Sequence, residues 1–260
     1  MQREPLDAVP IGLLFVAVCA FSGLALEGGY RLGRWRNARA ADEKEVPVGA
    51  MVGSVLALFA FLLAFTFGMA ANRFEARRQA VLDEANAIGT TYLRTRLLPH
   101  PQQGESARLL REYVDVRVRG VQEGKVEEVI KQSEEIHERL WAHATKAAEV
   151  QSGPITGLYI QSLNQVIDMH AVRVQVGTRS RIPAMIWLGL FSLAVLSMLC
   201  VGYQSGISVT RRSPAMAGLV LAFSGVMFLI ADLDRSREGF LTVSQQALID
   251  LQSSMKADKP

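Results

Sequence analysis

The chain has 260 residues, of which 50% are hydrophobic and 20% are charged, and its formal net charge is +3. Apolar and charged residues are segregated along the chain, which excludes both an ordinary soluble domain and a bundle embedded throughout in a membrane. The small net charge gives no reason to expect nucleic-acid binding. Both cysteines, Cys19 and Cys200, lie within apolar stretches, so no disulfide framework is expected.

Four apolar stretches are long enough to cross a bilayer as helices, since a hydrocarbon core takes about 20 residues. They cover residues 11–26, 48–71, 183–203 and 214–231. The first is the shortest and could also be a signal peptide. Glu4 and Asp7 precede it, whereas a signal peptide begins with net positive charge, so a retained helix is favoured.

The polar segment between the second and third stretches is also helical by its pattern. Apolar residues recur at helical spacing, and stop signals such as "LLPHPQQG" and "QSGP" separate the runs. The clearest run, residues 155–174, is expected to continue to Pro183. The sequence therefore predicts an all-α, polytopic membrane protein with four transmembrane helices. Its expected parts are membrane helices 1–71, a helical domain 72–181, membrane helices 182–234 and a C-terminal tail 235–260.

The second stretch carries one face that changes in size along its length. Gly49, Gly53 and Ala57 form a line of small residues that lets helices approach closely, and Phe61 and Phe65 continue the same spacing. A helix lining a symmetric pore would look like this, with a vestibule followed by an apolar neck that gates by dewetting. The alternative is that both phenylalanines face lipid or a protein core.

Charged residues gather where two of the spans end. Arg73, Glu75 and Arg77 follow the second stretch and are expected to act structurally at the junction with the helical domain, with Glu75 in reach of Arg78. We expect Arg73 to lie at the same membrane depth as the acids that follow the last stretch.

Those acids allow two interpretations. Asp232, Asp234 and Glu238 follow the last stretch closely enough to hold a hard cation, or to pair with neighbouring arginines. Glu27, at the edge of the first stretch, is expected to pair with a nearby base, to reach the lipid headgroups or to lie on an ion pathway.

Motifs for catalysis are missing from the sequence. Of the four histidines, His137 alone has a Glu-x-x-His partner, Glu134, and a metal site built that way needs a second such pair. Without a phosphate loop, nucleophile elbow or Cys-x-x-Cys pair, neither an enzyme nor a cofactor is expected.

Several motifs resemble one known family. "LLAFTFGMAANRFEARRQAVLDEANAIG" resembles bacterial bestrophins, in which an apolar pore helix ends in Phe and passes through an Arg-aromatic-Glu-Ala-Arg cluster into a cytosolic helix, although one aromatic of the usual pair is missing here. "DLDRSREGF" resembles the acidic motif after the last bestrophin span. Over nearly the whole length, "DEANAIGTTYLRTRLLP", "RIPAMIWLGL" and "DLDRSREGFLTVSQQALIDLQ" resemble uncharacterised bacterial membrane proteins described as bestrophin-like.

This resemblance implies a homopentameric ion channel in the bacterial inner membrane. The helical domain and both termini would be cytoplasmic, an orientation that the flanking charges favour weakly. Phe61 and Phe65 would form the neck of a pathway for inorganic ions, chloride or other monovalent ions, and Asp232 and Asp234 would be calcium candidates. The alternative is a non-conducting scaffold or sensor whose helical domain binds a protein partner.

Overall fold

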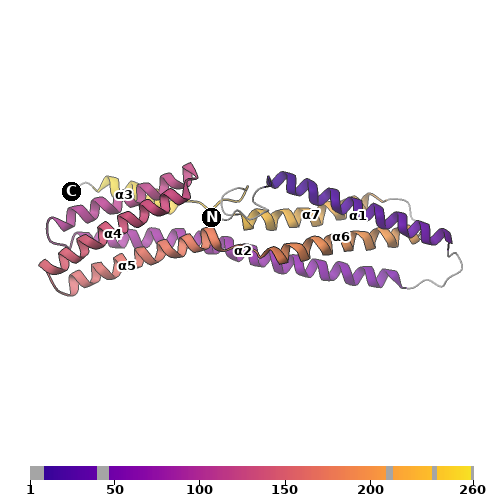
Figure 1. Ribbon diagram of the computed structural model, residues 1–260, viewed down its shortest axis with the longest axis horizontal. Coiled ribbons are helices and arrows are strands. Elements are labelled where there is room, and N and C mark those ends of the chain that lie inside the picture. Colours follow the sequence, from indigo (N-terminus) through magenta and orange to yellow (C-terminus); the bar gives the residue numbers. More distant parts are fainter. Residues whose placement is uncertain (1–8, 40–46, 209–212, 236–238, 259–260) are drawn as a thin grey trace. The chain divides into compact units, whose positions relative to one another are not determined.

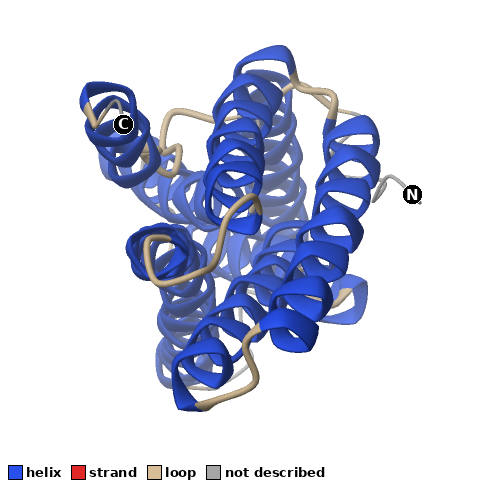
Figure 2. Ribbon diagram, turned by 90° about the vertical axis from the view of Figure 1, so that its left-hand side faces the viewer, coloured by secondary structure: helices blue, strands red, loops and turns tan. Residues whose placement is uncertain are grey.

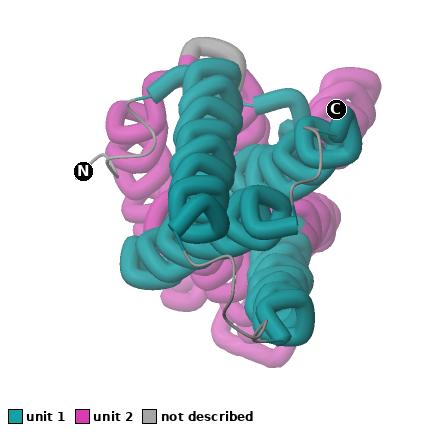
Figure 3. The backbone as a smooth tube through the Cα atoms, turned by 90° about the vertical axis from the view of Figure 1, so that its right-hand side faces the viewer, with its two compact units in different colours: residues 1–74, 181–242 teal, residues 75–180, 243–260 magenta. Residues whose placement is uncertain are grey.

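The structure, a computed structural model, describes residues 9–39, 47–208, 213–235 and 239–258. Every regular element in these ranges is a helix (Figure 2), which confirms the all-α prediction. The chain divides into two compact units (Figure 3). Unit 1 comprises Met1–Phe74 and Arg181–Thr242, and unit 2 comprises Glu75–Ser180 and Val243–Pro260.

Unit 1 contains the apolar helices. They are α1 (Ile11–Arg39), the first half of α2 (Val48–Thr95), α6 (Ala184–Ile207) and α7 (Pro214–Asp234), all labelled in Figure 1. Four helical segments are long and apolar enough to cross a membrane, which confirms the four predicted spans. Proline begins α7 at a position where its missing N–H costs nothing, and the Ser213 hydroxyl caps the helix by accepting the Ala215 N–H at 3.2 Å.

Helix α1 continues 13 residues beyond the predicted end of the first span, to Arg39. Close packing against α6 accounts for this extension. A Cβ on Gly29 would overlap the Leu199 carbonyl oxygen, and a Cβ on Gly202 would overlap the Leu26 carbonyl oxygen. One turn further on, Gly33 and Gly206 meet in the same way. The two helices therefore run in the same direction, with their backbones in direct contact along two Gly-x-x-x-Gly pairs.

Unit 2 is a helical bundle around the second half of α2. The other helices are α3 (Gln102–Glu123), α4 (Val126–Val150), α5 (Pro154–Val174) and α8 (Gln246–Ala257). Gly124 ends α3 in the left-handed conformation with φ 70°, which glycine adopts without a steric penalty. Proline begins α5 directly after Gly153.

Two features of unit 2 differ from the expectation. Helix α5 does not continue to Pro183, because after Val174 one π-helical turn, Gln175–Arg179, is followed by extended residues. The residue before a proline avoids the helical region, which accounts for Ile182 lying outside the helix. Helix α8 lies in the segment expected to be a tail, and it packs in unit 2 through Leu248 and Met255, which are fully or almost fully buried.

The glycine contacts of α1 generate a direct test. We expect Gly29→Ala to lower the stability of unit 1, because the added methyl group would force the two backbones apart, and overpacking typically costs about 1–3 kcal/mol. The matched control is Gly28→Ala, since nothing lies within 4 Å of a Cβ at that position. The control should be neutral or slightly stabilising, because alanine is the better helix former. Thermal unfolding in detergent compares the two variants, and equal melting temperatures would contradict the packing role.

Candidate functional site

One side of α2 in unit 1 is exposed in the part of the chain that the structure describes. Phe61 and Phe65 are 66% and 61% exposed, and Gly53 and Ala57 are exposed on the same side. We call these four residues the exposed face of α2. The opposite side of the helix packs into the core of unit 1 through buried residues such as Phe59. Two large aromatic rings on a membrane span must therefore contact lipid, another copy of the chain or a pathway.

The two glycines expected to pack α2 closely make little contact inside one chain. Among the described residues, nothing lies within 4 Å of a Cβ built on Gly53, and a Cβ on Gly49 would have only the Gln204 amide nitrogen nearby, at 3.1 Å. The backbone contacts within the chain are those of α1 with α6. The "GYRLG" and "GYQSG" spacings in those helices could have indicated them from the sequence. Packing of Gly49 and Gly53 against another copy stays a prediction.

The junction residues make ion pairs. Glu75 and Arg78 are 2.9 Å apart at the surface, as their spacing predicted. The Arg73 guanidinium lies 3.9 Å from the Asp234 carboxylate, beyond hydrogen-bond distance, with both side chains largely buried. Arg77 is only 5% exposed.

Nitrogen donors surround the acidic residues after α7. The Asp234 carboxylate accepts the Ile182 N–H at 3.0 Å and faces Arg181 as well as Arg73. The Asp232 carboxylate accepts the backbone N–H groups of Phe240 and Leu241 at 2.8 and 2.9 Å. Gly239 leaves room for that carboxylate, since a Cβ there would overlap Asp232 Oδ1.

These contacts are those of an ion-paired, hydrogen-bonded cluster, one of the two interpretations left open by the sequence. Calcium binds through several oxygen ligands, and no group of three or more potential ligands of the His, Cys, Asp or Glu type occurs in the described part of the chain. Glu238 lies outside the described residues. Glu27 pairs with Arg31 at 2.8 Å at the surface.

Unit 2 contains a buried charge cluster that sequence reasoning missed. Its centre is Glu84 on α2, which is completely buried. The carboxylate forms ion pairs with Arg117 of α3, at 3.1 Å, and with Arg173 of α5. It also accepts the Tyr113 hydroxyl of α3 at 2.6 Å, and Arg173 donates onward to Gln245 at 2.5 Å. One carboxylate thus ties together α2, α3, α5 and the segment before α8.

Two buried histidines complete this cluster. Because the Tyr113 hydroxyl gives its proton to Glu84, His170 of α5 must donate to the phenol oxygen from Nδ1, at 3.2 Å. The His137 ring of α4 packs against the rings of Tyr113 and His170, with centroids 4.8 and 5.1 Å apart. Glu134, the suggested metal partner of His137, is exposed, whereas His137 is buried.

The electrostatics of this cluster indicate a structural role. Burial acts to raise the pKa of Glu84, but Arg117, Arg173 and the Tyr113 hydrogen bond outweigh it and hold that pKa below its ordinary value. Burial lowers the pKa of His137 and of His170 to about 4, so both are neutral at neutral pH. A carboxylate that is fully engaged in this way is no general base.

A signal for this cluster does exist in the sequence. Glu84 shares the apolar helical stripe of Val81, Ala85 and Ile88, where a solvated acid would not be placed. A charge on a core-facing stripe indicates a buried partner of opposite sign. Which arginines supply that partner depends on how three helices pack, and that does not follow from spacing along one helix.

Comparisons with solved structures establish the fold. A variant of the bacterial bestrophin homologue from Klebsiella pneumoniae matches with a TM-score of 0.68 at 12% sequence identity, covering 95% of this chain and 98% of that one. A second crystal structure of the Klebsiella homologue matches with a TM-score of 0.64 at 13% identity, covering 96% of this chain and 100% of that one. No curated protein matches the chain.

The family model for the Bestrophin-like domain matches residues 19–248, nearly the whole chain. That match includes the membrane helices, the helical unit and the acidic segment after α7. It agrees with the fold and with the motifs around the second and last spans. The chain is a membrane protein that belongs to the Bestrophin-like family.

Proposed function

We propose that the chain assembles into a homo-oligomeric ion channel, a homopentamer, in which α2 of each copy lines a central pathway. The observation that carries this proposal is the exposed face of α2, with Phe61 and Phe65 unpacked on a membrane span. The match of residues 19–248 to the Bestrophin-like domain also supports it.

In this assembly the two phenylalanines of each copy form a hydrophobic neck. A ring of apolar side chains drives out water and so raises the barrier for ions. The edges of aromatic rings carry partial positive charge, which favours anions, so we propose chloride or another small monovalent ion as the permeant species. Gly53 and Ala57 would line the wider part of the pathway.

We further propose that unit 2 and both termini lie in the cytoplasm of a bacterial cell, with the chain in the inner membrane. The charges near the spans favour this orientation, though weakly. Unit 2 then serves as a rigid mount for the pore helix, because α2 is one unbroken helix from Val48 to Thr95 and Glu84 fixes its second half.

The neck is tested by measuring ion flux into proteoliposomes. We expect the double variant, which combines Phe61→Ala and Phe65→Ala, to raise ion flux severalfold because it removes the dewetting barrier. The oligomer should stay assembled. The matched control is Phe67→Ala. Phe67 is also exposed, at 41%, but it lies about 200° around the helix from Phe65.

Unchanged flux together with a lower melting temperature would place the rings in a packed interface and favour the non-conducting scaffold. Equal flux increases in the double variant and in Phe67→Ala would also contradict the neck. Native mass spectrometry of the same samples reports the number of copies.

Orientation is tested by cysteine labelling of intact cells, in a background in which Cys19 and Cys200 are replaced by serine. We expect Ala38→Cys, at the end of α1, to react with an impermeant maleimide added outside. Glu128→Cys, in α4, should react only after the cells are permeabilised. The reverse pattern would invert the topology.

The mounting role of unit 2 is tested at Glu84. We expect Glu84→Gln to destabilise unit 2 by about 3–5 kcal/mol, because two buried guanidinium groups lose their counter-charge. The control is Asp83→Asn, which changes the charge by the same amount. Asp83 is the neighbouring acid and accepts a surface hydrogen bond from Gln79. Amide hydrogen exchange should become faster in α3 and α5 of the first variant only. Equal protection of the α3 and α5 amides from exchange in both variants would show that Glu84 does not hold these helices.

A further inference from the structure

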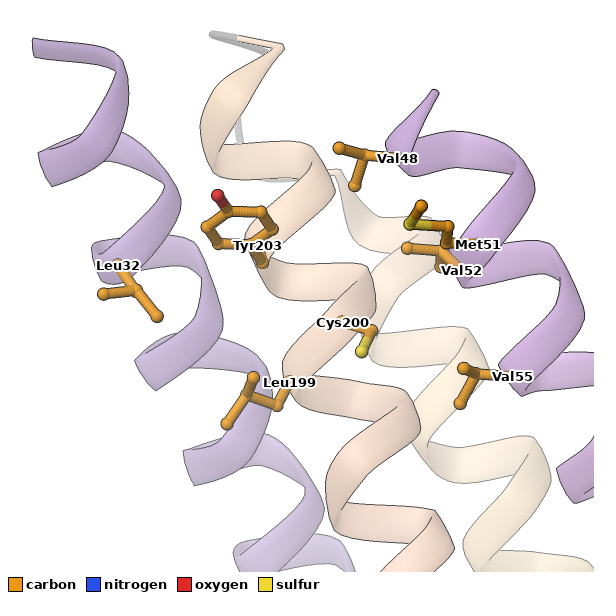
Figure 4. Close-up of a pocket in the computed structure, with 8 residues that line it drawn as sticks. All are labelled: Leu32, Val48, Met51, Val52, Val55, Leu199, Cys200 and Tyr203. Carbon is orange, nitrogen blue, oxygen red and sulfur yellow. The ribbon is translucent and has the colours of Figure 1, made fainter. Parts of the chain in front are cut away.

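An apolar groove of about 400 Å³ opens on unit 1 between three membrane helices. Its lining residues, shown in Figure 4, are Leu32 of α1, Val48, Met51, Val52 and Val55 of α2, and Leu199, Cys200 and Tyr203 of α6. Binding pockets for small molecules fall in the range of about 300–1,000 Å³. Leu32 and Met51 are 49% and 58% exposed, so the groove opens to whatever surrounds the spans.

The α1 side of the groove leads into a polar stripe. Trp35, Arg36 and Arg39 follow Leu32 at spacings of three, four and seven residues, which places them on one face of the helix. All three are exposed, and the Arg39 guanidinium lies 4.2 Å from the centre of the Trp35 ring. Along this face of α1, the apolar Leu32 is therefore followed by the Trp35 ring and then by the two arginines.

That order matches the parts of a membrane phospholipid. Acyl chains are apolar, tryptophan and tyrosine rings prefer the interfacial layer, and arginine pairs with phosphate. Figure 4 shows the Tyr203 ring between Leu32 and the α2 valines, with its hydroxyl on the side of the ring away from α2.

We propose that this groove binds an anionic phospholipid, with one acyl chain between α1, α2 and α6 and the headgroup phosphate at Arg36 and Arg39. The site does not depend on ion conduction. Because α1, α2 and α6 all contribute to the groove, a bound lipid stabilises their packing in addition to filling the space.

The acyl-chain part is tested by native mass spectrometry of the full chain titrated with dioleoyl-phosphatidylglycerol. We expect the unmodified protein to retain one lipid per copy, and Val55→Trp, which fills the groove, to lose it. Leu221→Trp is the control, since Leu221 lies on α7, is 55% exposed and does not line the groove. Retention by both tryptophan variants would overturn the site. A changed number of copies in Val55→Trp, with lipid retained, would assign the groove to a second copy.

The headgroup part is tested by replacing the two exposed arginines. Arg36→Gln with Arg39→Gln should reduce the preference for dioleoyl-phosphatidylglycerol over dioleoyl-phosphatidylcholine by about fivefold for each arginine removed. The control, Arg31→Gln with Arg34→Gln, changes the charge of α1 equally but on its other faces. Equal losses of preference in the two double variants would show that net charge alone attracts the lipid, and would contradict the proposed headgroup site.

Discussion

The structure depends on one constraint, which is that α2 is a single helix shared by two different environments. Its first half is apolar and packs in unit 1 through residues such as Phe59, whereas its second half carries the buried Glu84 in unit 2. Proline and glycine are the usual causes of helix breaks. Between Val48 and Thr95 the helix has no proline, and it continues unbroken through its four glycines, Gly49, Gly53, Gly68 and Gly89. Helix α2 therefore contributes residues to the cores of both units.

The two units are held by different physical means. In unit 1 the hydrophobic effect cannot drive helices together once they are surrounded by lipid, and backbone contact at Gly29 and Gly202 takes its place. In unit 2 an apolar core surrounds one buried carboxylate, and its arginine, tyrosine and histidine neighbours come from three further helices. A core of aliphatic side chains tolerates many packings, whereas a buried charge is satisfied by few, so Glu84 favours one arrangement of these helices.

The sequence predicted those parts of the fold that are local. The four spans and the helices between them follow from apolar length, periodicity and stop signals. The extension of α1 to Arg39 and helix α8 did not, because both depend on partners distant in sequence, α6 in one case and the core around Leu248 in the other. The sequence indicated the contact of Arg73 with an acid after α7. It did not indicate the cluster around Glu84, whose partners come from α3, α4 and α5. The Phe61 and Phe65 face was visible as a pattern, and its role in a pore stays a prediction.

The central claim is that α2 helices from several copies surround a symmetry axis, with the exposed face of each helix turned toward that axis. The most direct measurement is a density map of the purified oligomer in lipid nanodiscs, with Phe61 and Phe65 located relative to that axis. The proposed channel predicts five copies with both rings pointing toward the axis, forming the narrowest apolar part of a continuous pathway. A map in which these rings point outward into lipid, or are covered by α1, α6 or α7 of a neighbouring copy with no central opening, would contradict it.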